Sequence, residues 1–224
     1  MTLRSCVLLG GSGLVGGHLL QLLLADPAYR EVRVFTRRPL GLAPGSKVRE
    51  IAVDFDDPAT YRDHVAVDDL FCCLGTTIKK AGSQAAFRKV DFEAPVAIAR
   101  ASRQAGATRY LIVTAVGADP RSSIFYNRVK GETEAALREI AFPRGLAIFH
   151  PSMLLGERAE SRPAERFGAV LMKATRPLFA GGLARYRAID ASDVARAMHA
   201  AASQDGSATT VYEGKDLFAL GARP

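Results

Sequence analysis

The hydrophobic residues of this chain gather in short runs that are separated by longer segments with helical spacing. Short apolar runs that end at Gly, Pro or Asp are typical of buried strands. They predict strands at residues 6–9, 31–36, 48–53, 69–74, 109–114 and 146–149, with residues 210–213 as an optional last strand. Helical spacing predicts helices at residues 14–25, 83–105, 127–140 and 167–174, and a further helix that ends near residue 202. Because parallel strands need crossover connections, this alternation predicts an α/β fold with a doubly wound parallel sheet and helices on both faces.

Local signals predict where three helices end, bend or begin. Asp26-Pro27 should end the first helix, because proline cannot continue it. Pro95 lies inside a long helical segment and should kink it, since proline lacks the N–H that the helix would use. Ser192 or Asp193 is the expected N-cap of the last helix.

The composition fits one globular domain. Of the 224 residues, 48% are hydrophobic and 24% are charged, a balance that excludes fibrous and disordered proteins. The chain shows no linker, internal repeat or low-complexity tract, so we expect a single domain over residues 1–224. The pattern loosens in residues 151–190, which we expect to be a small substrate-side elaboration. Arg158, Glu160 and Arg162 in this region would line a substrate pocket or form a solvated loop network.

The apolar N-terminus is not expected to be a signal peptide or a membrane span. Glycines interrupt the apolar run, and His18 and Gln21 are polar positions within it. No other stretch approaches the roughly eighteen uninterrupted apolar residues that a membrane helix needs. We therefore expect a cytoplasmic location and no membrane contact.

The cysteines and histidines do not suggest a metal site. Cys6, Cys72 and Cys73 lie in predicted strands without metal-ligand spacing, so we expect reduced thiols. The adjacent Cys72 and Cys73 should point to opposite faces of the sheet. The four histidines share no ligand spacing with a carboxylate, and we expect no metal.

The formal net charge of +7 permits a phosphate-rich ligand or a nucleic acid as a partner. The densest basic positions are only the pairs Arg37-Arg38 and Lys79-Lys80. Because there is no long basic run and no interleaved aromatic platform, we expect no nucleic acid partner.

A glycine-rich turn at the start of the chain predicts a dinucleotide site. Gly10, Gly13 and Gly16 are spaced three apart where the first strand turns into the first helix. In this context they permit a tight turn, the approach of a pyrophosphate and close packing of helix on strand, as in Rossmann-type folds. The candidate cofactor residues of the turn are Gly10, Ser12, Gly13, Leu14, Val15 and Gly16.

The end of the second strand predicts a preference for NADP(H) over NAD(H). An NAD-specific site usually offers a carboxylate to the ribose hydroxyls there, whereas this chain has Arg37 and Arg38. Guanidinium groups at this place favour a 2′-phosphate. Solvated loop charges are the alternative interpretation of the two arginines.

Two further strand ends supply candidate cofactor contacts. Asp54 and Phe55 follow the third strand and would contact the adenine, although Asp54 is equally suited to cap the helix at Pro58. The fourth strand ends in a segment whose backbone would pass beside a ribose. Its candidate residues are Leu74, Gly75, Thr76 and Thr77.

Tyr126 and Lys130 lie four residues apart at the start of a predicted helix and therefore share one helical face. Thr114 ends the fifth strand, twelve residues before Tyr126. A hydroxyl, a phenol and an ammonium are thus expected near the glycine-rich turn.

With these motifs in this order, the chain resembles the short-chain dehydrogenase/reductase superfamily. It is most similar to the atypical subgroup typified by TIP30. The shared motifs are CCLGTTI at 72–78, Val90-Asp91, VGAD at 116–119, YNRVKGETE at 126–134, HPSMLL at 150–155 and ESRP at 160–163. The resemblance extends from Leu8 to about Ala202.

The resemblance implies an NADP(H)-dependent reduction of a small carbonyl compound. Tyr126 would exchange a proton with the substrate oxygen as hydride moves to or from the nicotinamide. Lys130 would bind the nicotinamide ribose and lower the pKa of Tyr126. Thr114 would orient the carbonyl, a role for which Ser122 and Ser123 are alternatives because the related pattern has two serines at the strand end.

Further implications of the resemblance concern the cofactor and the function class. Pro151 matches a position where the backbone passes the nicotinamide amide, and Ser152 beside it is a further cofactor candidate. A cofactor-sensing protein that acts through protein partners is an alternative function. An epimerase or dehydratase of nucleotide sugars is another, for which the chain is short. The substrate and the choice between monomer and homodimer stay open.

Overall fold

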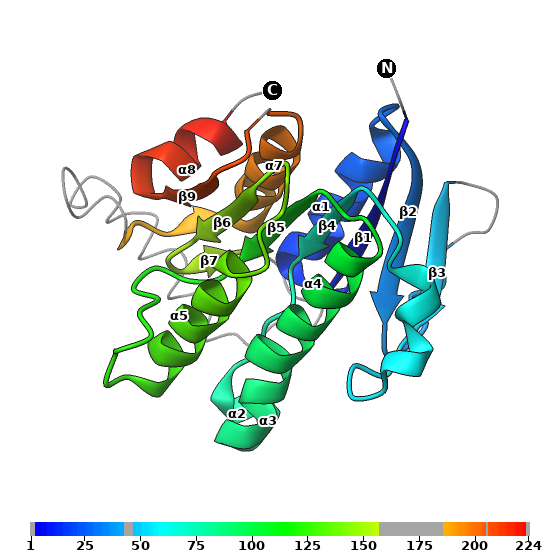
Figure 1. Ribbon diagram of the computed structural model, residues 1–224. Helices are drawn as coiled ribbons and strands as arrows, with labels where there is room; N and C mark the ends of the chain where they lie inside the picture. The colour runs from blue at the N-terminus through cyan, green and yellow to red at the C-terminus, as the bar shows by residue number, and fades with distance from the viewer. Residues whose placement is uncertain (1–2, 43–46, 157–185, 205, 223–224) are drawn as a thin grey trace.

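The computed structural model describes residues 3–42, 47–156, 186–204 and 206–222 (Figure 1). Its centre is a seven-stranded parallel sheet with the strand order β3-β2-β1-β4-β5-β6-β9. The strands are β1 (Arg4–Leu9), β2 (Tyr29–Thr36), β3 (Val48–Ala52), β4 (Asp69–Cys72), β5 (Arg109–Val113), β6 (Leu146–His150) and β9 (Thr209–Glu213). Two short strands, β7 (Leu154–Leu155) and β8 (Ile189–Asp190), form a separate parallel pair. The predicted parallel sheet is confirmed, and the optional last strand is present as β9.

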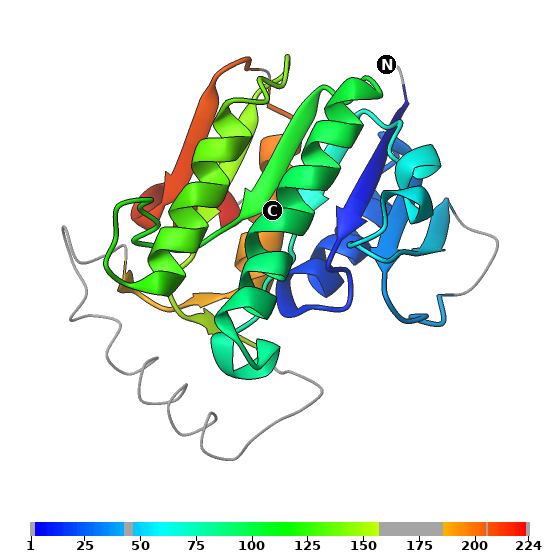
Figure 2. The ribbon, with the colours of Figure 1, turned by 60° about the horizontal axis from the view of Figure 1, so that its bottom comes forward.

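Helices cover both faces of the sheet, as predicted (Figures 1 and 2). One face carries α1 (Leu14–Ala25), α7 (Ala191–Ala202) and α8 (Gly214–Gly221), and the other carries α4 (Ala94–Gln104) and α5 (Phe125–Arg138). Shorter helices are η1 (Pro58–Thr60), η2 (Arg62–His64), α2 (Ile78–Ala81), α3 (Gln84–Arg88) and η3 (Lys89–Glu93). None of the described helices is long and apolar enough to cross a membrane. The predicted helix at 167–174 and the candidates Arg158, Glu160 and Arg162 lie outside the described residues.

Alternate residues of the central strands enter opposite halves of the core. Cys6 and Leu8 of β1 pack in the half under α1 and α7, whereas Val7 packs in the half under α4 and α5. Because both faces are covered, the middle residues of β1, β4, β5 and β6 are apolar toward both faces, and the polar residues stand at the strand ends. Cys72 and Cys73 also enter opposite halves, as predicted, and all three cysteines are free.

The long predicted helix at 83–105 is three consecutive segments, α3, η3 and α4. The middle segment, Lys89–Glu93, has the wider π-helical form and directly precedes the turn that contains Pro95. Pro95 has no N–H to donate to the carbonyl of Asp91, and that carbonyl instead accepts a hydrogen bond from the Thr133 hydroxyl at 2.8 Å. The helical segment is therefore distorted directly before Pro95, whereas the kink itself stays a prediction.

The predicted N-cap of α7 is wrong. The helix begins at Ala191, so Ser192 and Asp193 lie inside its first turn. The N-cap position is Asp190, whose side chain makes no capping hydrogen bond, while Asp193 binds Arg196 on the same helix. The helix starts earlier than expected because β8 leads directly into it. The short helix α8 was not predicted.

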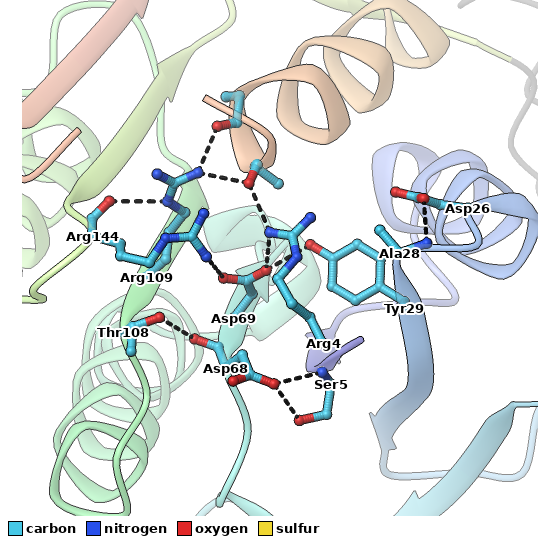
Figure 3. A network of polar contacts seen from close by, with 12 residues as sticks. Arg4, Ser5, Asp26, Ala28, Tyr29, Asp68, Asp69, Thr108, Arg109 and Arg144 are labelled. Atoms are coloured by element: carbon cyan, nitrogen blue, oxygen red, sulfur yellow. Dashed lines mark hydrogen bonds and ion pairs between the residues drawn. The ribbon is translucent and has the colours of Figure 1, made fainter. Parts of the chain in front are cut away.

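At the amino ends of the strands, a buried carboxylate and two arginines hold the C-terminus of α7 (Figure 3). Asp69 is fully buried and accepts hydrogen bonds from Arg4 and from the Tyr29 hydroxyl, both at 2.7 Å. Arg4 and Arg109 both donate to the carbonyl of Ala202, at 2.8 and 2.6 Å. Positive charge at a helix C-terminus is favourable, because the last carbonyls lack helical partners. This edge of the sheet is opposite to the glycine-rich turn, and its polar contacts join β1, β2, β4 and β5 to the end of α7.

Candidate cofactor and catalytic site

The glycine-rich turn lies where the strand order reverses. β1 pairs with β2 on one side and β4 on the other, and the helices that follow β1 and β4 cover opposite faces. Such a reversal opens a crevice at the carboxyl ends of the strands, where open α/β sheets bind their ligands. Gly10 has a φ of +78°, and a Cβ at this position would lie 2.6 Å from the Cys73 carbonyl oxygen. The turn after β1 therefore touches the loop after β4.

Small residues keep the start of α1 open. The Gly13 N–H donates to the Gly10 carbonyl at 2.9 Å, and Gly13 is the N-cap without a side-chain capping bond. A Cβ at Gly16 would overlap the Gly10 carbonyl oxygen. The first N–H groups of a helix have no helical acceptors, so this bare turn fits a pyrophosphate. Of the other candidates here, Ser12 is exposed, Leu14 is half-buried and Val15 is buried.

Arg37 and Arg38 leave β2 at the same edge of the sheet. Leu9 of β1 pairs with Phe35 of β2, so the chain after β2 continues at the level of the glycine-rich turn. Both arginines are exposed, and among the described residues neither guanidinium is paired with an acid. The Arg38 N–H donates to the Thr36 hydroxyl at 3.2 Å, which shapes this loop.

The candidates after β3 have specific local contacts. Asp54 is exposed, and its carboxylate accepts a hydrogen bond from the Asp56 N–H at 3.0 Å. The alternative that Asp54 caps the next helix is wrong, because Asp57 accepts the capping bond from the Ala59 N–H. Phe55 is half-buried and packs against the half of the core under α4 and α5.

Lys130 joins α5 to the segment that leaves β4, residues 74–77. Its side chain is nearly inaccessible, and its Nζ lies 2.8 Å from Asp91 Oδ1 and 6.0 Å from the centroid of the Tyr126 ring. The other oxygen of Asp91 accepts a hydrogen bond from the Thr76 N–H at 3.0 Å. A Cβ at Gly75 would lie 3.9 Å from Lys130 Nζ. The structure thus brings Lys130, Tyr126 and the loop after β4 together.

The electrostatics keep Lys130 charged. Burial lowers the pKa of Lys130, but the negative charge of Asp91 and the proximity of Tyr126 raise it, and the net pKa lies above its ordinary value. Asp91 is the site residue that sequence reasoning missed. The π-helical turn before Pro95 directs this carboxylate inward, and the motif Val90-Asp91 was the available signal.

Thr114 is buried at the end of β5, and its hydroxyl donates to Glu134 Oε1 at 2.7 Å. The alternatives Ser122 and Ser123 lie in the loop before α5. Ser122 is half-buried and accepts a hydrogen bond from the Ile124 N–H at 3.2 Å, whereas Ser123 is exposed. Of these three candidates, Thr114 is therefore the one whose hydroxyl is hydrogen-bonded to a side chain of α5.

The remaining candidates border this site. The Tyr126 ring is half-buried and packs against Phe87 with a centroid separation of 5.5 Å. The Pro151 carbonyl accepts a hydrogen bond from the Val116 N–H at 3.1 Å, and the Ser152 hydroxyl donates to the Arg187 carbonyl. Within Leu74–Thr77, the Thr77 hydroxyl caps α2 by accepting from the Lys80 N–H at 3.1 Å.

Comparison with protein families gives a match to the NAD(P)H-binding family over residues 10–141. A mitochondrial FMP52 protein of Coccidioides immitis is 30% identical in an alignment of 243 positions that covers 98% of this chain and 97% of that protein. The protein HTATIP2 (TIP30) of Rattus norvegicus is 36% identical over 72% of this chain and 67% of its own length. The resemblance to the TIP30 subgroup is thus confirmed.

Solved structures support the fold. MoeE5 with UDP-glucose and NAD superposes with a TM-score of 0.68 and 20% identity, over 97% of this chain and 81% of its own. The UDP-glucose 4-epimerase of Thermotoga maritima gives a TM-score of 0.70 and 15% identity, over 93% and 76%. The predicted Rossmann-type fold is confirmed.

The expected cytoplasmic location is contradicted by the sequence relatives. Several of these relatives are FMP52 proteins that are named as mitochondrial, from Coccidioides immitis, Emericella nidulans and Aspergillus niger. The absence of a signal peptide pattern and of a long apolar segment, on which the expectation was based, does not distinguish the cytoplasm from an organelle.

Proposed function

Because the chain belongs to the NAD(P)H-binding family and is related to FMP52 and TIP30 proteins, we propose that it is an NADP(H)-dependent oxidoreductase. Its substrate would be a small carbonyl compound, as in the short-chain dehydrogenase/reductase superfamily. The observation that carries the proposal is the position of Lys130, which is buried and charged between Tyr126 and the loop after β4. A buried cation at this place serves both cofactor binding and proton transfer.

The glycine-rich turn and the arginines after β2 support the choice of cofactor. The bare start of α1 would hold the pyrophosphate, and Arg37 with Arg38 would bind a 2′-phosphate. When bound, the nicotinamide supplies or accepts the hydride. Asp54 and Phe55 would border the adenine, and Leu74–Thr77 would pass beside a ribose.

Tyr126 and Lys130 would carry the proton chemistry. The Tyr126 hydroxyl would give its proton to the carbonyl oxygen as that oxygen becomes an alkoxide. The ammonium of Lys130 would bind the ribose and favour the deprotonated phenol that remains. Asp91 would keep Lys130 in place, because it binds both Lys130 Nζ and the Thr76 N–H.

The remaining contacts of the proposed site would position the substrate and the nicotinamide. Thr114 would contact the substrate through its hydroxyl oxygen and so orient the carbonyl, with Ser122 and Ser123 as the less enclosed alternatives. Pro151 and Ser152 would lie beside the nicotinamide amide, since both follow the carboxyl end of β6.

A cofactor-sensing protein is the second candidate function. The ion pair with Asp91 supports it, because Asp91 balances the charge of Lys130, which would then still bind a ribose but act more weakly on the Tyr126 phenol. In that case the protein would bind the nucleotide and signal through a protein partner.

The test is a titration with NADPH and with NADH, followed by nicotinamide fluorescence, on the wild type and on Arg37→Ala. We expect Arg37→Ala to weaken NADPH binding by roughly ten- to hundredfold, toward the affinity for NADH, because a charge-assisted bond to the 2′-phosphate is lost. The matched control is Arg30→Ala, which removes the same charge at the amino end of β2.

The outcomes separate the alternatives. If Arg37→Ala and Arg30→Ala weaken NADPH binding equally, only the net charge of the protein matters. The assignment of Arg37 to the 2′-phosphate would then be wrong. If neither nucleotide binds to the wild type, the proposed function fails. Binding with turnover of a carbonyl panel that Tyr126→Phe abolishes supports the reductase, and binding without any turnover favours the sensor.

A further inference from the structure

A buried hydrogen-bonded chain, here called the Thr–Glu–His cluster, links Thr114, Glu134, His150 and Glu213. Glu134 Oε1 accepts hydrogen bonds from the Thr114 hydroxyl and from His150 Nε2, both at 2.7 Å. His150 Nδ1 lies 2.9 Å from Glu213 Oε2. Thr114, Glu134 and His150 are 3–8% exposed. The mechanism proposed above uses only Thr114 of these four residues.

The cluster lies on the same side of the sheet as Tyr126 and Lys130. Side chains alternate along a strand, and Ile112 of β5 and Ile148 of β6 both enter the core half under α4 and α5. Thr114 and His150 stand two positions further along these strands and face α5 as well. On α5, Glu134 follows Lys130 by one turn and Tyr126 by two turns.

The charges of the cluster fix the direction of its hydrogen bonds. Burial lowers the pKa of His150, but the hydrogen bond and the charge of Glu134, followed by those of Glu213, raise it to a net value above its ordinary pKa. Burial raises the pKa of Glu134, but the bonds from His150 and Thr114 and the charge of Arg138 lower it overall. Glu134 is thus an ionised acceptor, and the Thr114 hydroxyl must donate its single hydrogen to it.

We propose that Glu134 and His150 are positioning residues, which hold the Thr114 hydroxyl in one orientation for the reaction at Tyr126. The inference rests on the proposed function. With its hydrogen bound by Glu134, Thr114 presents only lone pairs to the crevice. These lone pairs can accept a hydrogen bond from a donor group of the substrate, such as a hydroxyl beside the carbonyl, and so hold the carbonyl oxygen at Tyr126. His150 in turn fixes Glu134, and it does so next to Pro151 at the end of β6.

The test is a kinetic double-mutant cycle on the full chain with Thr114→Val and Glu134→Met. Methionine has a similar size to glutamate and cannot accept the Thr114 hydrogen as a carboxylate does. We expect each single variant to lower kcat by roughly ten- to hundredfold with an unchanged Kd for NADPH. The double variant should be no slower than Thr114→Val, because Glu134 acts through Thr114. Thr114→Ser keeps the hydroxyl and should restore kcat to within about threefold of the wild type.

Controls separate positioning from folding. Glu132→Gln changes a half-buried carboxylate on the same helix, which pairs with Arg88, and should leave kcat unchanged. Thermal unfolding reports which variants are folded, and Glu134→Leu, which also lacks an acceptor, replaces Glu134→Met in the cycle if the latter unfolds. If the wild type is active and the kcat losses of the two single variants add up in the double variant, Glu134 does not act through Thr114. That result would overturn the positioning role and leave the proposed reduction standing. NADPH binding without turnover in every form, wild type included, would overturn the proposed reduction and the positioning role with it.

Discussion

His150 is a buried residue whose ionisation affects the interior of this protein. It is a buried imidazole between Glu134 and Glu213, and Arg138 lies 3.2 Å from the other oxygen of Glu134. Losing the imidazolium charge would leave two carboxylates and one neutral ring in a poorly solvated place. The imidazolium of His150 therefore stabilises the contact of β6 with α5 and with β9.

The stability of the wild type should depend on pH through this pair. The folded pKa of His150 is raised, so its contribution is fully present below its unfolded pKa of about 6.5 and is lost as pH rises through the folded value. The folded pKa of Glu134 is lowered, so its contribution is present above its unfolded pKa of about 4.3 and is lost as pH falls through the folded value. The pair should stabilise the fold most in the window between these limits.

Urea unfolding of the wild type and of His150→Gln from about pH 3 to about pH 9 checks this expectation. The difference in the free energy of unfolding should be largest inside the window and should shrink at both ends. A difference that stays constant over the whole range would show that His150 stabilises the protein only by packing.

At the scale of elements, the contact between β1 and α1 fixes the candidate cofactor site. The helix starts directly after a turn in which Gly10 touches the loop after β4 and Gly16 touches the Gly10 carbonyl. Neither contact leaves room for a side chain. The geometry that opens the turn to a phosphate is the same geometry that packs α1 onto the sheet.

Gly16→Ala should push α1 away from the turn. We expect a loss of about 1–3 kcal/mol in the free energy of unfolding, because the new methyl group overlaps a backbone oxygen. NADPH binding should weaken in parallel. Denaturant unfolding and the fluorescence titration measure the two effects.

The adjacent Gly17→Ala is the matched control for this substitution. A Cβ there would lie 3.7 Å from the Gly11 carbonyl oxygen, an ordinary contact, and alanine favours a helix. Gly17→Ala should therefore be neutral or stabilising. Equal destabilisation by both substitutions would contradict the packing argument.

On the scale of the whole molecule, the two edges of the sheet have different roles. The carboxyl edge brings together the glycine-rich turn, the loop after β4 and the start of α5, which form the candidate site. The amino edge buries Asp69 with Arg4 and Tyr29, and Arg109 binds the last turn of α7 (Figure 3). Burial raises the pKa of Asp69 although Arg4 opposes the shift, so this carboxylate depends on its partners to stay ionised.

Arg109→Met should separate stability from cofactor binding. Arg109 is 4% exposed and donates to several carbonyls at the end of α7, which would lose their partner. We expect a loss of about 2–4 kcal/mol in the free energy of unfolding and a Kd for NADPH within about twofold of the wild type. Arg103→Met, whose guanidinium makes one exposed bond to the Ala141 carbonyl, is the control and should cost little. A large change in the NADPH Kd of folded Arg109→Met would show that the two edges are coupled.

The local sequence pattern was sufficient to predict the fold and much of the candidate site. Apolar runs in alternation with helical segments predicted the parallel sheet. This prediction was possible because strand and helix periodicity are set by residues that are close together in the sequence. The spacing of Gly10, Gly13 and Gly16 predicted the turn into α1, and the four-residue spacing of Tyr126 and Lys130 placed both on one face of α5. The cap of α7 was misjudged because the small sheet of β7 and β8 set the start of the helix.

Only the tertiary structure decided which charges meet inside the protein. Lys130 pairs with Asp91 from a different helix, and His150 pairs with Glu213, which is 63 residues away in sequence. Helical and strand periodicity say which face a residue occupies, but they do not say which distant residue occupies the opposite face. The polar partners of Lys130 and Thr114 therefore followed from the strand order and the packing of α4 and α5, because a buried charge is stable only where the fold supplies its counterpart.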